Sequence, residues 1–171
     1  MIGGNFYEDY SRCKSLRKCG FLRLFLVYPE FRILMLHRIR CRSRIIRLLL
    51  KPFDIVNTHS LFITCQDLEG GLFLEHAFAT IISCRHIGKN CWFNQQVTIG
   101  YSDAVHCPYI GDDVHIKAGA KVIGDVTIGD DVIIGANAIV VKDVPPHSIV
   151  VGVPAKIVKF RDSKDSEWKN I

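Results

Sequence analysis

The chain has 171 residues, of which 49% are hydrophobic and 23% charged, so it can bury a core and is not a disordered polypeptide. Its charge is unevenly divided: residues 1–51 contain 12 Lys and Arg against 3 Asp and Glu, whereas residues 52–171 contain 10 against 14. A basic first part and a mildly acidic second part predict two regions with different roles.

Seven cysteines are scattered along the chain, and neither a CxxC pair nor a zinc-type Cys/His spacing occurs. This pattern predicts free thiols, no metal and a reducing, cytoplasmic location. Residues 1–6 lack the basic and apolar segments of a signal peptide. The apolar stretch 21–35 is interrupted by charges and a proline, so we expect no membrane span.

The basic residues 1–58 are expected to form an N-terminal helical region. A short helix is predicted at 21–28. A longer one is predicted from Pro29 to Leu50, because Pro and Glu suit its first turn and no Gly or Pro interrupts it before Lys51-Pro52. Residues 53–59 then form a linker.

The partner of the basic region is open at this point. No nucleic-acid motif accompanies its arginines and no aromatic residues interleave with them, so nucleic acid is not an expected partner. A cap packed against the acidic part of the chain is the first interpretation, and a weak contact with an anionic membrane surface is the alternative.

Apolar residues recur every six positions through the second part of the chain. They are Ile87, Phe93 and Ile99 and, after a gap of eleven, Ile110, Ile116, Val122, Ile128, Ile134 and Val140, accompanied by small or β-branched residues at Val114, Ala120, Val126, Val132, Ala138 and Val144. A six-residue period fits neither a strand nor a helix and is typical of a parallel β-helix, in which three hexads make one coil.

The repeat extends toward the N-terminus with one interruption. The six-residue phase places Phe62, Leu68 and Leu74 inside the coil, and a one-residue slip then places Ile81 inside. We therefore expect a β-helix domain over residues 59–160, with about thirteen hexads in a little over four coils. Residues 161–171 are left as a C-terminal tail.

Three motifs close the repeat: IGDDVIIGANA at 128–138, VKDVPP at 141–146 and GVPAK at 152–156. Together they resemble the hexapeptide-repeat acyltransferases over about residues 62–159. The motif GGLFLEH at 70–76 is similar to the glycine-rich turn of the serine acetyltransferase branch. The short helical part resembles the acetyltransferases of surface-polysaccharide clusters.

This resemblance implies a mostly β fold, a left-handed parallel β-helix with a short N-terminal α-helical region. It also implies a homotrimer with active sites between subunits and acetyl transfer from acetyl-CoA to a hydroxyl group. The acceptor that it implies is a small molecule, either L-serine or a sugar.

Acetyl transfer to a hydroxyl needs a base, and histidine suits this role because its ordinary pKa lies near working pH. The chain has seven histidines, and the resemblance singles out His76 as the catalytic one. His106 is the second catalytic candidate. It lies in residues 101–109, where the gap of eleven inserts a loop into a coil, and loops on rigid scaffolds often carry sites.

Two acidic residues are candidates for substrate binding. The resemblance implies that Glu75 contacts the acceptor, although the serine-specific pattern has Asp there. The resemblance also implies an Asp that orients the catalytic histidine, but at or near that position this chain has Leu61, and Asp67 is out of phase with the motif. The orienting group of His76 is therefore open between a backbone carbonyl and a loop acid such as Asp103.

The resemblance also implies a coenzyme groove along the C-terminal coils, where small residues allow close approach and cations meet the phosphates. The matching positions are Ala118, Gly119, Ala136, Lys142, Lys156 and Lys159.

Two other kinds of function compete with this one. A carbonic-anhydrase-like metal hydratase would need three converging histidines, and the spacing of the histidines does not reproduce that set. A non-catalytic trimeric scaffold would not need the intact histidine and coenzyme motifs.

Overall fold

A computed structural model of the chain describes residues 2–42, 45, 48 and 60–171. It begins with three helices, α1 (Ile2–Arg17), α2 (Phe21–Val27) and α3 (Pro29–Arg42). The second and third confirm the helices expected at 21–28 and from Pro29. The predicted helix end near Leu50 and the linker at 53–59 lie outside the described residues. None of the described helices is long and apolar enough to cross a bilayer.

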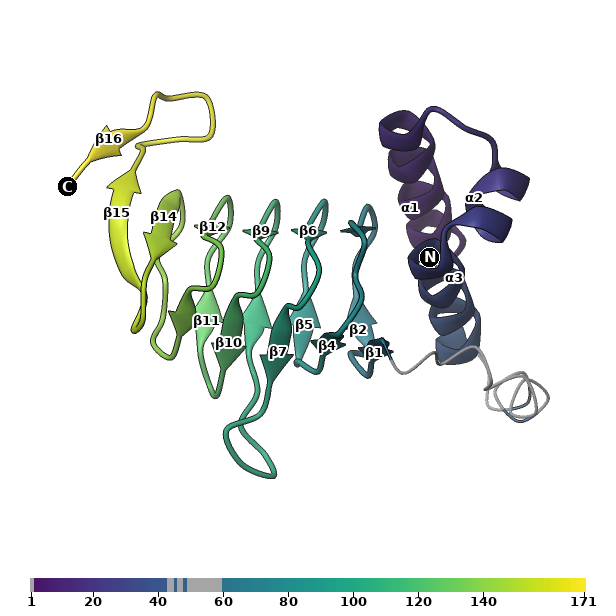
Figure 1. Cartoon of the computed structure of the whole chain (residues 1–171), viewed down its shortest axis with the longest axis horizontal. Helices are drawn as coiled ribbons and strands as arrows, with labels where there is room; N and C mark the ends of the chain where they lie inside the picture. Colours follow the sequence, from purple (N-terminus) through teal and green to yellow (C-terminus); the bar gives the residue numbers. More distant parts are fainter. Residues whose placement is uncertain (1, 43–44, 46–47, 49–59) are drawn as a thin grey trace.

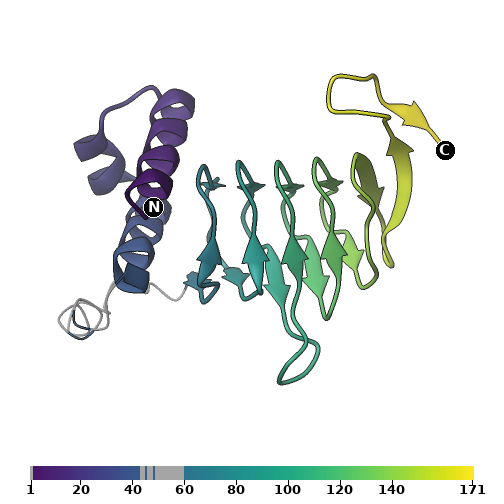
Figure 2. The same ribbon diagram turned by 180° about the vertical axis from the view of Figure 1, so that it is seen from behind.

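Short strands then wind into three sheets that form the sides of a prism (Figures 1 and 2). The first sheet contains β1 (Leu61–Ile63), β4 (Thr80–Ile82), β7 (Thr98–Gly100), β10 (Lys121–Ile123) and β13 (Ile139–Val140). The second contains β2 (Asp67–Leu68), β5 (His86–Ile87), β8 (Tyr109–Ile110) and β11 (Thr127–Ile128). The third contains β3 (Phe73–Leu74), β6 (Trp92–Phe93), β9 (His115–Ile116), β12 (Ile133–Ile134), β14 (Ser148–Val151), β15 (Lys156–Phe160) and β16 (Lys169–Asn170).

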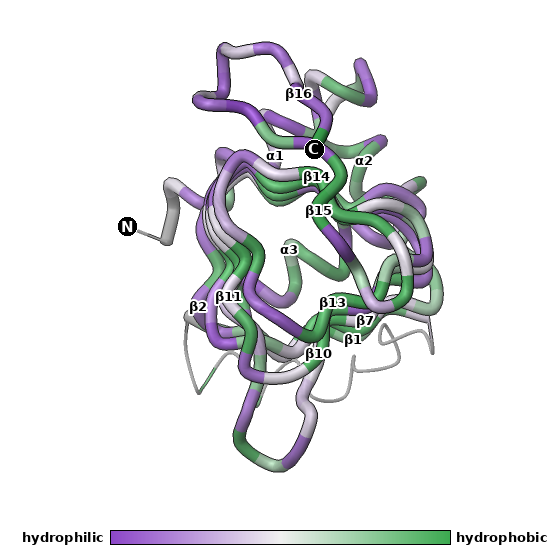
Figure 3. Tube along the Cα trace, turned by 90° about the vertical axis from the view of Figure 1, so that its left-hand side faces the viewer, coloured by the Kyte–Doolittle hydropathy of each residue, from purple (hydrophilic) through white to green (hydrophobic). Residues whose placement is uncertain are grey.

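The pairing follows one rule from β1 to β13: each strand pairs in parallel with the strand three places later in the chain, and β12 then pairs in parallel with β14. Ile82 of β4 pairs with Ile99 of β7, for example, and Ile87 of β5 pairs with Ile110 of β8. Figure 3 looks along the stack and shows the coils superposed. This topology confirms the predicted parallel β-helix with a short helical region before it.

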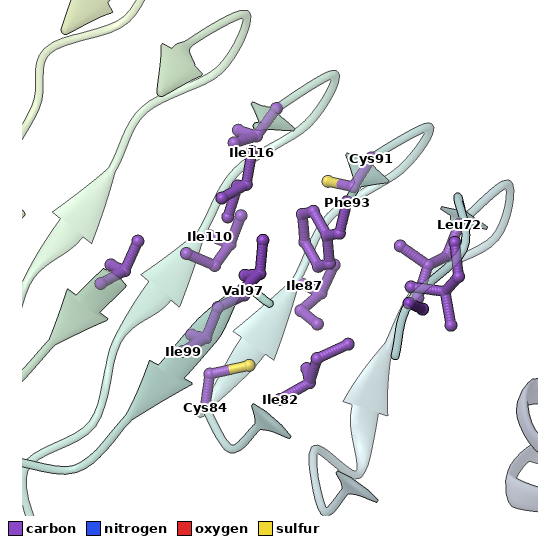
Figure 4. Close-up of a cluster of buried hydrophobic side chains, with 14 of the residues drawn as sticks. Leu72, Ile82, Cys84, Ile87, Cys91, Phe93, Val97, Ile99, Ile110 and Ile116 are labelled. Atoms are coloured by element: carbon purple, nitrogen blue, oxygen red, sulfur yellow. The ribbon is translucent and has the colours of Figure 1, made fainter. Parts of the chain in front are cut away.

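The prism is filled by the residues that the six-residue period selected (Figure 4). All nine repeat residues from Ile87 to Val140 are at most 2% exposed. The accompanying small and β-branched set, Val114 to Val144, is also buried. Because each coil is only one strand thick along the stack, its interior side chains are covered mainly by the coils on either side.

Two positions of the predicted inner set are wrong. Phe62 and Ile81 pair with each other on the outside of the first sheet and are 49% and 44% exposed, whereas Ile82 is fully buried. Leu74 pairs with Phe93, and Ile82 pairs with Ile99. Along the chain, Ile82 is eight residues after Leu74, whereas Ile99 is six residues after Phe93. The slip is therefore two residues, and both extra residues lie in the turn at 75–79.

The turns between the sheets form the three edges of the prism. The His76 edge joins the third sheet to the first, at residues 75–79, 94–97, 117–120 and 135–138. The loop edge joins the first sheet to the second and includes the projecting residues 101–108, while the glycine edge joins the second to the third at 69–72, 88–91, 111–114 and 129–132. The long loop is the one that projects below the coils in Figure 1.

The helical region covers the open end of the first coil. Arg38 of α3 forms a buried ion pair with Asp9 of α1, with Nε and Oδ2 2.8 Å apart, and donates hydrogen bonds to the carbonyl groups of Leu68 and Glu69. Asp9 also accepts a hydrogen bond from the backbone N–H of Leu72. These side chains bond backbone groups that lack a preceding coil.

The opposite end of the prism is closed differently. There β15 pairs antiparallel with β14, and β16 with β15, which extends the third sheet beyond the last coil. Asp131 holds the chain near this end, because its carboxylate binds both Arg161 and His147. The guanidinium of Arg161 also lies 4.3 Å from the ring centre of Trp168.

Candidate active site

His76 lies in the turn that interrupts the repeat. Its φ angle is +61°, and the N–H of Ala77 donates a hydrogen bond to the carbonyl of Glu75 across it, at 2.7 Å. A non-glycine residue at the centre of so tight a turn is strained, and such strain gathers at functional sites. The imidazole is exposed, and no hydrogen bond of its nitrogens occurs within the described part of the chain.

Glu75 is held by the next coil. Trp92 Nε1 and Asn94 Nδ2 both donate to Glu75 Oε2, each at 3.0 Å. The other carboxylate oxygen, Oε1, has no hydrogen-bond partner among the residues that the structure describes. The side chain therefore keeps one oxygen for a further donor next to His76.

His106 and Asp103 form a pair in the loop at 101–108. Asp103 Oδ2 lies 2.6 Å from His106 Nδ1, and Oδ1 accepts the backbone N–H groups of Val105 and His106. These bonds, first the backbone one from His106, lower the pKa of Asp103 to about 2, and the carboxylate in turn raises the pKa of His106. Asp103 thus orients His106 in this chain, not His76.

His76 and His106 do not meet within one chain. His76 lies on the His76 edge between β3 and β4, whereas His106 lies on the loop edge between β7 and β8, two coils further along. The other acidic candidate, Asp67, is hydrogen-bonded to His86 at 2.7 Å on the outside of the second sheet. Leu61 is buried and cannot orient a histidine.

The small residues expected to line a coenzyme groove share the His76 edge. Ala118 is half-buried and Ala136 exposed, one coil apart, in line with the turn that carries His76. Gly119 has a structural reason of its own. Its φ is +75°, and a Cβ there would overlap Oδ1 of Asn137, so this glycine lets the Asn137 side chain approach.

The three candidate lysines are exposed but separated from one another. Lys156 begins β15 and pairs with Val151, near the C-terminal end of the His76 edge. Lys159 is the fourth residue of β15, in the third sheet, and pairs with Ile149. Lys142 lies on the loop edge, so it does not share an edge with Ala118 and Ala136 in the same chain.

Trp92 and Asn94 were not predicted as site residues. In the sequence, these residues are marked only by a polar run at 94–96 beside a tryptophan. The structure pairs Asn94 with Glu75. The register of the hexads could have predicted this contact. Once the interruption of the repeat is assigned to the turn at 75–79, Leu74 aligns with Phe93, and residue 75 then lies beside residue 94.

All seven cysteines lie in the described ranges, and none of them forms a disulfide there. Across the described ranges, no group of three or more His, Cys, Asp or Glu side chains is arranged to hold a metal ion.

The chain resembles known proteins along the β-helix and beyond it. A family model described as bacterial transferase hexapeptide (six repeats) matches residues 107–142. The serine acetyltransferase of Staphylococcus xylosus is 46% identical over 93 residues, which are 52% of this chain and 43% of that protein. That of Synechococcus elongatus is 33% identical over 147 residues, 80% of this chain and 60% of that protein.

The crystal structure of Neisseria gonorrhoeae serine acetyltransferase in complex with serine matches with a TM-score of 0.75 at 30% identity, covering 91% of this chain and 68% of that one. The coils and their repeat thus define a hexapeptide-repeat β-helix protein. Within that class, the chain belongs to the serine acetyltransferase family. It spans about half the length of the curated relatives that it matches.

Proposed function

We propose that this protein is an acetyl-CoA-dependent O-acetyltransferase that acetylates the hydroxyl of L-serine in the cytoplasm. The observation that supports this most is the His76 edge. It carries an exposed histidine in a strained turn at one end, and small residues suited to a long coenzyme at Ala118 and Ala136 further along. Its relative from Neisseria gonorrhoeae has been solved with serine.

In this proposal His76 is the general base that takes the proton from the acceptor hydroxyl as it attacks the thioester carbonyl. Glu75 binds a second polar group of the acceptor. The coenzyme runs past Ala118, Gly119 and Ala136, and its phosphates meet Lys156 and Lys159, with no metal in the reaction.

The active site is completed by a second copy of the chain in a homotrimer. His76 and His106 lie on different edges of one prism, so a site that uses both needs the loop of a neighbouring copy. The exposed apolar residues beside the His76 turn, Phe62, Phe78 and Ile81, offer a contact surface for that copy. Asp103 would then orient His106 toward the acceptor, and Lys142 of the same loop edge would reach the neighbour's coenzyme.

The direct test is an acceptor screen that follows free thiol release from acetyl-CoA with L-serine and with a panel of sugars. We expect turnover with serine and none with the sugars. A sugar hydroxyl is the second candidate, because Glu75 replaces the aspartate of the serine-specific pattern. Turnover only with sugars would establish it, and no turnover with any acceptor would favour the non-catalytic scaffold.

The shared site is tested by mixing two inactive variants. His76→Ala and His106→Ala should each be inactive alone, and unfolding and refolding them together should restore part of the activity, because mixed trimers contain some intact sites. No recovery in mixed trimers would contradict a site built from two copies.

A further inference from the structure

Glu75 is half-buried, and its carboxylate is bonded through one oxygen. Both of its side-chain hydrogen bonds arrive at Oε2, one from an indole N–H and one from an amide. A carboxylate can accept about four hydrogen bonds. Glu75 therefore has one oxygen, Oε2, anchored by two donors, and the other, Oε1, left to accept from a ligand.

The two donors are themselves fixed. The ring of Trp92 meets the edge of Phe73 on the preceding coil at 5.0 Å between ring centres, and His115 on the following coil at 5.6 Å. Lys117 Nζ lies 5.6 Å from the same ring centre. The backbone N–H of Asn94 donates to the carbonyl of Ile116 at 3.0 Å, which ties it to the third coil.

The backbone of Glu75 is tied to the same place, because its N–H donates to the carbonyl of Phe93 at 2.9 Å. The main chain and one carboxylate oxygen are thus both bonded to β6 and the residue that follows it. A glutamate has more rotatable bonds than an aspartate, and immobilising such a side chain when a ligand binds costs free energy. Anchoring it beforehand removes much of that cost.

We propose that Trp92 and Asn94 are positioning residues: by bonding Glu75 Oε2 they hold Oε1 ready to bind the polar group that the acceptor carries beside its reactive hydroxyl. The inference rests on the proposed acetyl transfer and adds to it two residues that neither touch the reacting atoms nor bind the coenzyme. Their effect lies in acceptor binding, since the proton is taken by His76.

The experiment compares steady-state kinetics of Trp92→Phe and Asn94→Ala with the wild type. Phe keeps the aromatic packing and removes only the N–H donor. Each substitution should raise the KM for the acceptor about tenfold, the usual effect of losing one hydrogen bond to a charged group, with kcat and the KM for acetyl-CoA unchanged. Trp168→Phe makes the same change at the tryptophan packed on Arg161, and we expect wild-type kinetics from it.

A double-mutant cycle identifies the partner through which Trp92 acts. In a Glu75→Gln background, adding Trp92→Phe should change the acceptor KM by less than about twofold, because residues that act through one contact are not additive. A readout without turnover uses the Trp168→Phe chain, in which Trp92 is the sole tryptophan. Its indole N–H resonance should shift when Glu75→Gln is added.

Three outcomes overturn the positioning role. They are a wild-type acceptor KM in Trp92→Phe, a fall in kcat in place of the rise in KM, and independent effects of Trp92→Phe and Glu75→Gln. An indole N–H resonance of Trp92 that does not shift when Glu75→Gln is added also contradicts this role. If the wild-type chain transfers acetyl to no acceptor, the proposed function fails and the positioning role fails with it; the other outcomes leave the proposed function intact.

Discussion

The helical region and the β-helix are held together by different means. In the β-helix, each coil repeats the contacts of its neighbours, so one residue type at every sixth position builds the core. The helical region meets the first coil through contacts that occur only once. Apolar side chains such as Leu34 lie beside Phe73 and Leu74, and the polar groups of Asp9 and Arg38 bond the backbone of the coil. A solenoid needs a different structure wherever its repetition stops, because the end coil has backbone groups with no neighbouring coil to bond.

The two regions also meet near the candidate site. The guanidinium of Arg17 lies 5.3 Å from the ring centre of Phe73, and Phe73 packs against Trp92, which bonds Glu75. The helical region therefore supports Glu75 through packing, while His76, Ala118 and Ala136 belong to the coils.

The largest expected effect tests whether the chemistry belongs to the β-helix. His76→Ala should lower kcat by roughly a hundredfold to ten-thousandfold, as expected for loss of a general base. Coenzyme binding and trimer assembly should remain, as measured by calorimetry and light scattering. His147→Ala, on a histidine bound to Asp131 far along the prism, should keep wild-type turnover. Wild-type turnover in His76→Ala would place the base elsewhere.

The attachment of the helical region is tested at its buried ion pair. Asp9→Ala leaves Arg38 buried without a carboxylate and should lower the free energy of unfolding by about 3–5 kcal/mol. The matched change is Asp125→Ala, which breaks the half-exposed pair with Arg85 and should cost less than about 1 kcal/mol. Urea denaturation followed by circular dichroism measures both. Equal small losses would show that the ion pair does not hold the two regions together.

The corrected phase of the repeat predicts opposite results at adjacent isoleucines. Ile82→Ala should destabilise the protein by about 2–5 kcal/mol, because it opens a cavity inside the prism. Ile81→Ala removes an exposed side chain of the first sheet and should cost less than about 1 kcal/mol within the isolated chain. Denaturation at a concentration where the chain is monomeric separates this from any effect on assembly. If Ile81→Ala lowered the free energy of unfolding more than Ile82→Ala, Ile81 would be the inward-facing residue and the slip in the repeat would be one residue.

The smallest effect concerns the pH dependence of the loop at 101–108. Asp103 raises the pKa of His106 above its ordinary value of 6.5, and His106 helps to lower that of Asp103 to about 2. The pair therefore stabilises the loop fully between about pH 4 and 6.5. Its contribution is lost as pH rises through the pKa of His106, or falls toward 2. In Asp103→Asn, the His106 titration followed by NMR should move back toward 6.5; an unchanged midpoint would contradict the pairing.

Most of the architecture followed from the sequence, because a period of six repeats one local rule many times. The rule failed at the turn before β4, where the two extra residues carry no periodic signal of their own. Within the candidate site, His76 and Glu75 were predicted through a family motif, and their roles remain proposals. Trp92 and Asn94 were not predicted, because their contact with Glu75 depends on which residues lie side by side in neighbouring coils. Asp103 was one candidate for orienting His76, but the turn of the loop places its carboxylate within hydrogen-bond distance of His106.

The sequence by itself determined the division of charge, the β-helix and the motif that contains His76. The described helices lie in the basic part of the chain, and the coils lie in the acidic part. Only the tertiary structure decided how the regions join and which side chains share an edge. It set Arg38 on the carbonyls of the first coil, and it set His76 and His106 on different edges. Periodicity records which residues face inward, whereas contacts between coils depend on register, and register shifts with every residue added to a turn.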